Sequence, residues 1–291
     1  MPTTVKTTPT AMHECGRPMP HVPGVTHRFV PAHGATFHVA QAGHGVPVVL
    51  LHGLPQHWYA WRKVISELAG DFQLFCVDLR GCGWSEPTRR GYATADQARD
   101  ILAVMDALGL DQVHLIGHET GGWLGFELCR QAPDRFSGFL ALNVAPPSAP
   151  AAELIRGAWR FWYTSFWEYP GAGRTLLRRW PWFTSFLLRR WAGRFYHWDE
   201  AALREFVQAS RTKGQSRAIE RMLWQFVLHD IPALVSGRNR HRNLAVPTRI
   251  LGGELDPVCR PKAGVEPVPG GHLLPETAPK LVAAAARDLF E

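Results

Sequence analysis

A carboxylate at the tip of a glycine-rich turn is the first feature of this sequence that could do chemistry. Glu119 lies in the stretch GHETGG (117–122), directly after the apolar run VHLIG. A strand that turns sharply into a helix in this G-x-nucleophile-x-G pattern needs small flanking residues, because the two backbones pass close to each other. The free N–H groups at the start of the helix favour negative charge at the tip. We therefore predict that Glu119 is a catalytic carboxylate.

Three further stretches supply residues that could act with Glu119. In HGLP (52–55) a tight turn follows an apolar run, and the N–H of Leu54 is predicted to face the same point as the N–H of Thr120. Two such donors would form an oxyanion hole. LGGELDP places Asp256 after another apolar run, and VPGGHLLPE places His272 in a loop before the last helix. An imidazole oriented by a carboxylate is the usual general base near neutral pH, so His272 is the predicted base and Asp256 its partner.

The residues around these turns must be positioned by strands and helices that alternate along the chain. Apolar runs separated by amphipathic patterns indicate an α/β fold with a mostly parallel, doubly wound sheet covered on both faces. The period-two pattern of residues 25–43 predicts an antiparallel hairpin at the sheet edge. Buried histidines, His52 and His118, are predicted to support the turns. The apolar runs lie at 48–52, 72–78, 113–117, 136–143 and 247–253.

The domain organisation follows from changes in composition. Residues 1–24 are rich in Pro, Thr and His and are predicted to form a mobile N-terminal tail. Residues 25–145 and 243–291 are predicted to form the α/β core. Residues 146–242, which hold most of the tryptophans, are predicted to form a helical lid over the carboxyl ends of the strands.

Composition excludes several classes of protein. No stretch resembles a secretory signal or a membrane span, so we expect no integral membrane segment. Five cysteines without zinc-type spacing indicate reduced thiols, a cytoplasmic protein, and neither metal nor cofactor. The net charge of +7 arises in the lid, where arginine stems are expected to cover apolar faces, so nucleic acid is not expected. We expect a small apolar substrate, and the sequence permits a homodimer.

The motifs resemble, in order, those of the α/β-hydrolase-fold epoxide hydrolases, which are related to the haloalkane dehalogenases. HGLPQHWYAWR, DLRGCGWSEP, GHETGGW, GGELDP and GGHLLPE carry the resemblance, which extends from about Val25 to the C-terminus. It implies an α/β-hydrolase fold with a lid. It also implies that a carboxylate at position 119 attacks an epoxide carbon, and that His272, oriented by Asp256, activates water to hydrolyse the ester.

The sequence departs from that family in four places. Glu119 stands where the family has aspartate, which advances the carboxylate by about 1.5 Å. Thr120 replaces a tryptophan that serves dehalogenases as a halide donor, which disfavours dehalogenation. In the family, two tyrosines of the lid activate the epoxide oxygen. Tyr163 matches the first of them, but Trp224 occupies the position of the second, for which Tyr169 and Tyr196 are further candidates.

The fourth departure is the short segment 257–271 before His272, where the helix normally found in the family is predicted to be missing. Trp224 is assigned to substrate binding, together with Pro55 and Trp123, which flank the two turns.

Three functions remain open from the sequence. The first is hydrolysis of an epoxide through an ester on Glu119. The second is elimination, cyclisation or isomerisation, with Glu119 and His272 as acid and base. The third is a binding protein that has lost catalysis, in which Glu119 only caps a helix.

Overall fold

Eight strands form one sheet in the order β1-β2-β4-β3-β5-β6-β7-β8. The computed structural model describes residues 17–148, 171–236, 244–261 and 264–291. β1 pairs antiparallel with β2, and β2 pairs antiparallel with β4, so the predicted hairpin lies at the sheet edge. All other pairs are parallel, which confirms the predicted fold class. The strands are β1 (Thr26–Ala32), β2 (Ala35–Ala42), β3 (Val46–Leu51), β4 (Phe72–Val77), β5 (Val113–His118), β6 (Phe136–Leu142), β7 (Thr248–Gly253) and β8 (Glu266–Val268).

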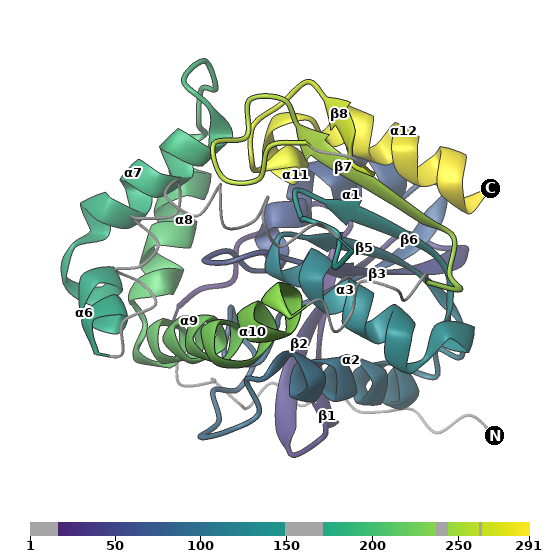
Figure 1. Cartoon of the computed structure of the whole chain (residues 1–291), viewed down its shortest axis with the longest axis horizontal. Helices are drawn as coiled ribbons and strands as arrows, with labels where there is room; N and C mark the ends of the chain where they lie inside the picture. The colour runs from purple at the N-terminus through teal and green to yellow at the C-terminus, as the bar shows by residue number, and fades with distance from the viewer. Residues whose placement is uncertain (1–16, 149–170, 237–243, 262–263) are drawn as a thin grey trace.

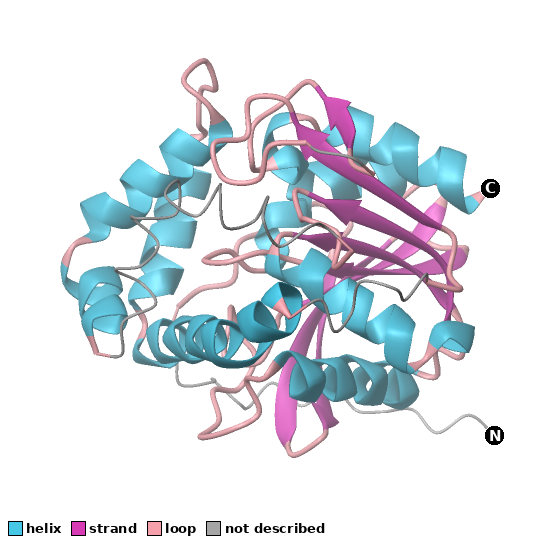
Figure 2. Cartoon of the chain, in the orientation of Figure 1, coloured by secondary structure: helices cyan, strands magenta, loops and turns pink. Residues whose placement is uncertain are grey.

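Helices cover both faces of this sheet (Figures 1 and 2). One apolar core lies under α2 (Thr94–Leu108) and α3 (Thr120–Gln131), and the other lies under α1 (Arg62–Leu68) and α12 (Pro279–Phe290). Because both faces are covered, every residue of β5 is buried, which explains its continuous apolar sequence. Three short helices complete the core: η1 (Trp58–Trp61), η2 (Pro133–Arg135) and α11 (Leu274–Thr277).

The parallel register places the carboxyl ends of the central strands side by side. Leu51 at the end of β3 pairs with Gly117 of β5, and Leu142 at the end of β6 pairs with both His118 and Leu251. The loops that follow these strands therefore leave the sheet at one edge. Those loops carry the predicted site residues.

A group of helices is inserted between β6 and β7 and lies to one side of the sheet (left in Figure 1). Its members contact loops at the carboxyl edge: Gln215 of α9 donates a hydrogen bond to the carbonyl of Pro55 at 2.9 Å and accepts one from the N–H of Gly83 at 3.0 Å. The inserted elements are α6 (Ala172–Arg179), α7 (Pro181–Ala192), α8 (Glu200–Arg211), α9 (Lys213–Gln225), the π-helical turn η4 (Phe226–Asp230) and α10 (Ile231–Val235).

The described part of the predicted tail, residues 17–24, contacts the folded chain. The Arg17 guanidinium pairs with Glu205 of α8 at 2.6 Å and lies over the Trp84 ring at 4.7 Å. Met19 and Val22 pack against the core beneath α1. These residues thus connect the inserted helices to the core.

Candidate active site

Glu119 occupies a strained turn between β5 and α3. Its backbone has φ 50° and ψ −111°, a conformation that non-glycine residues rarely adopt. The turn is so tight that a Cβ on Gly121 would lie 2.1 Å from the carbonyl oxygen of Leu51. The sequence pattern therefore reflects a real steric requirement, and the turn leaves the Glu119 side chain partly exposed.

The Glu119 carboxylate is held through one of its two oxygens. Oε2 accepts hydrogen bonds from the N–H of Leu54 at 2.9 Å and from the N–H of Thr120 at 2.6 Å. The Thr120 hydroxyl donates a third. No described residue donates a hydrogen bond to Oε1. The structure thus brings the two predicted oxyanion-hole amides onto one oxygen, and the other oxygen receives no hydrogen bond from the described residues.

The turn that carries Leu54 is braced from behind by buried polar groups. His52 accepts a hydrogen bond from the N–H of Leu79 through Nε2 at 3.0 Å and donates one to the carbonyl of Gly53 through Nδ1 at 3.0 Å. Burial lowers the pKa of His52 to about 4, so the ring is neutral and keeps this tautomer. Asp78, which follows β4, accepts from the N–H of Trp58 at 2.7 Å. The oxyanion turn is therefore fixed by the loop after β4.

His272 and Asp256 form a buried pair. Nδ1 of His272 donates to Oδ2 of Asp256 at 2.8 Å. The Asp256 carboxylate also accepts from the Nδ2 of Asn143 at 2.8 Å and from the N–H groups of Val258 and Cys259 at 2.6 and 2.9 Å. These donors fix the carboxylate and, through it, the imidazole. The Nε2 of His272 makes no hydrogen bond with a described residue.

The surroundings of His272 favour its charged form. Burial, the largest influence, lowers its pKa, but the charge of Asp256, the hydrogen bond that His272 donates to that residue and the charge of Glu119 together outweigh burial and raise the pKa. The imidazole therefore lies within electrostatic range of the Glu119 carboxylate. If Glu119 lost its charge by forming an ester, the pKa of His272 would fall and the neutral base would become available.

His118, beside the tip, links the elbow to the histidine loop. Its Nε2 donates to the carbonyl oxygen of His272 at 2.8 Å, and its ring lies 5.6 Å from the His272 ring. Burial lowers the pKa of His118 to about 3. This geometry fits the structural role predicted for His118.

The short segment before His272 does not displace the imidazole. As predicted, no helix lies in the described part of residues 257–271, and the three-residue strand β8 pairs with β7. The loop is held instead by α7, because the N–H of His272 donates to the carbonyl of Trp191 at 2.7 Å. A Cβ on Gly271 would lie 2.5 Å from the same carbonyl oxygen. The inserted helices therefore contribute to placing the His272 side chain.

The predicted substrate-binding residues lie in different places. Pro55 is buried, and its carbonyl is held by Gln215. Trp123 packs edge-on against Phe226 at 5.5 Å and lines a hollow of about 550 Å³, whose lining includes neither Glu119 nor His272. Trp224 is 37% exposed on α9 and makes no ring contact or hydrogen bond with a described residue.

Of the three tyrosines that are candidates for the lid positions, the structure describes Tyr196. Tyr163 and Tyr169 lie outside the described residues. The hydroxyl of Tyr196 is held by Glu276, to which it donates, and by the ammonium of Lys63 at 2.6 Å. Burial raises the pKa of Tyr196, so this phenol is a poor proton donor.

Three contributions to the site were missed in the sequence. Asn143 follows β6 at φ 51° and donates a hydrogen bond to Asp256. The sequence pattern that could have indicated this role is a polar residue directly after a buried strand. The Trp191 ring lies 5.5 Å from the ring of His272, and nothing in its helix sequence singled it out. The Thr120 hydroxyl donates to the Glu119 carboxylate, a contact that the oxyanion-hole pattern does not predict because that pattern concerns only the backbone N–H.

The described ranges contain no group of three or more His, Cys, Asp or Glu side chains that could hold a metal ion. No helix within them is long and apolar enough to cross a bilayer.

Comparison with known proteins shows the family of this chain. The profile of the alpha/beta hydrolase fold family matches residues 46–290, so the chain belongs to that family. Over 122 residues it is 38% identical to the soluble epoxide hydrolase of Corynebacterium sp. (strain C12), a match that covers 42% of this chain and 43% of the relative. Over 153 residues it is 31% identical to the fluoroacetate dehalogenase of Burkholderia sp., covering 50% of each.

A solved structure extends the similarity to nearly the whole chain. The epoxide hydrolase CorEH matches with a TM-score of 0.77 and 28% identity over 91% of this chain and 98% of that one. The curated matches span no more than half the length of those two relatives. The predicted membership of the α/β-hydrolase fold and the resemblance to epoxide hydrolases are confirmed.

Proposed function

We propose that this chain is a hydrolase that opens an epoxide of a small apolar substrate through an ester on Glu119. The observation that carries the proposal is the unequal treatment of the two carboxylate oxygens. Oε2 is held by the amides of Leu54 and Thr120, whereas no described residue donates to Oε1. A carboxylate fixed in this way presents a nucleophile in a defined position.

In the first step Oε1 of Glu119 attacks an epoxide carbon. A C–O ester bond forms, the C–O bond of the three-membered ring breaks, and its electron pair remains on the departing oxygen. That oxygen must be stabilised and protonated by the lid, for which the sequence resemblance nominates Tyr163 as the first donor and Trp224, whose indole N–H is a weaker acid, at the second position.

In the second step His272 takes a proton from water, and the hydroxide attacks the carbonyl carbon of the ester. The negative charge that develops on Oε2 is stabilised by donors already within hydrogen-bonding distance, namely the two amides and the Thr120 hydroxyl. Collapse breaks the ester C–O bond, and the departing alkoxide takes the proton held by His272 and leaves as the diol. The second proton of the water returns to the lid donor, which restores that donor and the free carboxylate. The pair with Asp256 stabilises the imidazolium that forms during this step.

Atom balance provides a specific signature of this pathway. The oxygen that adds to the substrate comes from Glu119, and the oxygen of water enters the carboxylate. In a single turnover in ¹⁸O-labelled water we therefore expect the label in residue 119 and not in the diol. Direct attack of water on the epoxide would place the label in the diol of that same turnover.

Trapping of the ester tests the proposal. His272→Gln removes the base, so incubation with styrene oxide should increase the mass of the protein by one epoxide, and peptide mapping should locate the adduct at Glu119. Glu119→Gln/His272→Gln serves as the matched control and should remain unmodified. A folded His272→Gln variant that forms no adduct with any reactive epoxide would contradict an ester on this residue.

The dehalogenase-type reaction receives no support from the residue after the tip. Thr120 directs its hydroxyl to the Glu119 carboxylate, so this side chain is not positioned as a halide donor. We therefore place ring opening of an epoxide ahead of displacement of a halide.

A further inference from the structure

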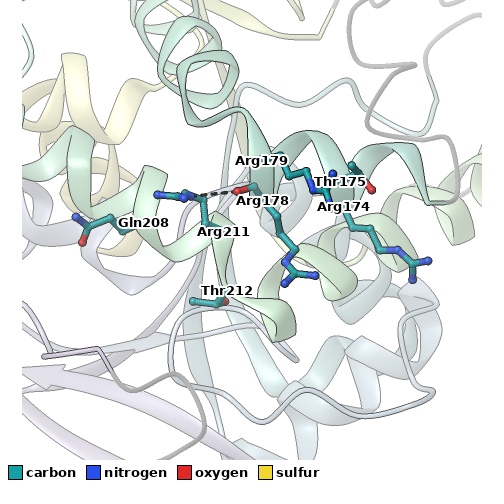
Figure 3. A pocket seen from close by; sticks show the side chains of 7 residues that line it. All are labelled: Arg174, Thr175, Arg178, Arg179, Gln208, Arg211 and Thr212. Carbon is teal, nitrogen blue, oxygen red and sulfur yellow. Dashed lines mark hydrogen bonds between the residues drawn. The ribbon is translucent and has the colours of Figure 1, made fainter.

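A hollow between the inserted helices is lined by arginines. It has a volume of about 700 Å³. Figure 3 shows the side chains of Arg174 and Arg178 projecting from α6, and that of Arg211 reaching across from α8. Arg179 and Thr212 complete most of the wall, and the Nε of Arg211 donates to the carbonyl of Arg178 at 3.2 Å. Neither Glu119 nor His272 lines this hollow.

The positive charge of the hollow is largely uncompensated within the described chain. Arg178, Arg179 and Arg211 form no ion pair with a described carboxylate. The one carboxylate near Arg174, that of Glu220, lies 3.9 Å away, at the limit of an ion pair. Like charges gathered in this way repel one another, so an anion bound from solution would relieve the repulsion.

The acidic side chains of the same helices are engaged elsewhere. Oε2 of Glu220 accepts from the N–H of Gly171 at 2.7 Å. Glu200 pairs with Arg189 at 2.7 Å, and Glu205 pairs with Arg17 at 2.6 Å. Within the described residues, Glu200 and Glu205 therefore pair with arginines outside the hollow, and Glu220 at 3.9 Å from Arg174 is the one carboxylate paired with an arginine of its lining.

The lining indicates which kind of anion would bind. The described lining residues are arginine, threonine and glutamine, with no carboxylate and no aromatic ring. Guanidinium groups match the oxygens of phosphate, and a hollow of this volume admits a small molecule. Recognition of single-stranded nucleic acid usually relies on aromatic stacking, which this lining does not offer. We propose that the hollow binds a small anion that carries two or more phosphate groups.

The phosphate groups could belong to a soluble anion or to a lipid headgroup. Trp180 and Trp182 follow the arginines of α6 along the chain and are 50% and 63% exposed. Exposed tryptophans beside basic residues are typical of surfaces that contact a membrane interface. Both sources present the same chemistry to the hollow, and experiment can separate them.

Calorimetric titration of the full chain with sodium tripolyphosphate tests the site. Arg178→Ala/Arg211→Ala should weaken binding roughly tenfold or more, because each arginine contributes charge-assisted hydrogen bonds. The matched control, Arg28→Ala/Arg99→Ala, removes the same charge from exposed positions on β1 and α2 and should change the affinity less than about twofold. Thermal unfolding of each variant establishes that the fold is retained.

Sedimentation with phosphatidylcholine vesicles, with and without phosphatidic acid, identifies the source. Binding of tripolyphosphate without sedimentation assigns a soluble anion. Sedimentation that requires phosphatidic acid, Arg178 and Trp182 assigns a headgroup, and either result supports the site. The proposal is overturned if neither probe binds, or if the control variant loses as much affinity as the hollow variant.

Discussion

Shortening the side chain at position 119 is the most direct test of whether this site is built for glutamate. Oε2 of Glu119 lies 2.9 Å from the amide nitrogen of Leu54 and 2.6 Å from that of Thr120. Glu119→Asp withdraws the carboxylate by about 1.5 Å, the length of one C–C bond. A retreat of that size takes both amides out of hydrogen-bonding range at the present backbone position.

The magnitude of the effect follows from these contacts. Loss of one oxyanion-hole donor typically lowers kcat by about 10²- to 10³-fold, and misplacement of a reacting group by about 1 Å can cost about 10²-fold. Both losses arise from the same displacement, so they do not multiply. We expect Glu119→Asp to slow ester formation roughly a hundredfold.

The assay compares rates of adduct formation by intact-mass spectrometry. Glu119→Asp/His272→Gln is measured against His272→Gln with excess styrene oxide, and thermal unfolding confirms that both are folded. If the aspartate variant forms the ester as fast as the glutamate protein, or faster, then the amides are not placed for the longer side chain and this reasoning is refuted.

Four further predictions concern the groups that support the site. Thr120→Val should slow hydrolysis of the ester by about tenfold or more, because a hydrogen bond to a charged oxygen is lost, whereas Thr120→Ser should retain the rate in a single-turnover assay. Asn143→Ala should lower the free energy of unfolding in urea by about 2 kcal/mol, because the Asp256 carboxylate loses a donor; an unchanged midpoint would argue against this anchor. Gln215→Leu leaves a buried carbonyl and a buried N–H without partners and should cost about 2 kcal/mol by the same measurement. Ester hydrolysis should accelerate as the pH rises through the pKa of His272, because the neutral imidazole is the base. Glu119→Gln should lower the pKa of His272 in an NMR titration, since the negative charge that raises it is removed. A pKa of His272 that stays the same or rises in this variant would contradict the coupling between the two residues.

Some features of the site could be predicted because local sequence dictates them. The elbow is one example, since a Cβ at position 121 would lie 2.1 Å from a backbone oxygen and only glycine is tolerated there. The parallel sheet is another, because strands covered on both faces must be apolar throughout, as in β5. Given these two features, Glu119 had to lie at the carboxyl edge of the sheet.

The pairing of distant groups could not be read from the chain. Asn143 and Asp256 meet because the ends of β6 and β7 are neighbours, and either residue alone resembles an ordinary turn former. The missing helix before His272 says nothing of what holds that loop, whereas in the structure α7 holds it through the carbonyl of Trp191. Such contacts join residues far apart in sequence, and their geometry depends on packing that no local pattern encodes.

The sequence by itself therefore determined the kinds of groups present and the edge of the sheet at which they gather, because backbone sterics and hydrophobic periodicity are local properties. Only the tertiary structure decided which oxygen of Glu119 is held by the amides of Leu54 and Thr120. That choice depends on amides from two separate turns converging within about 3 Å of one atom, a distance fixed by the packing of the whole sheet.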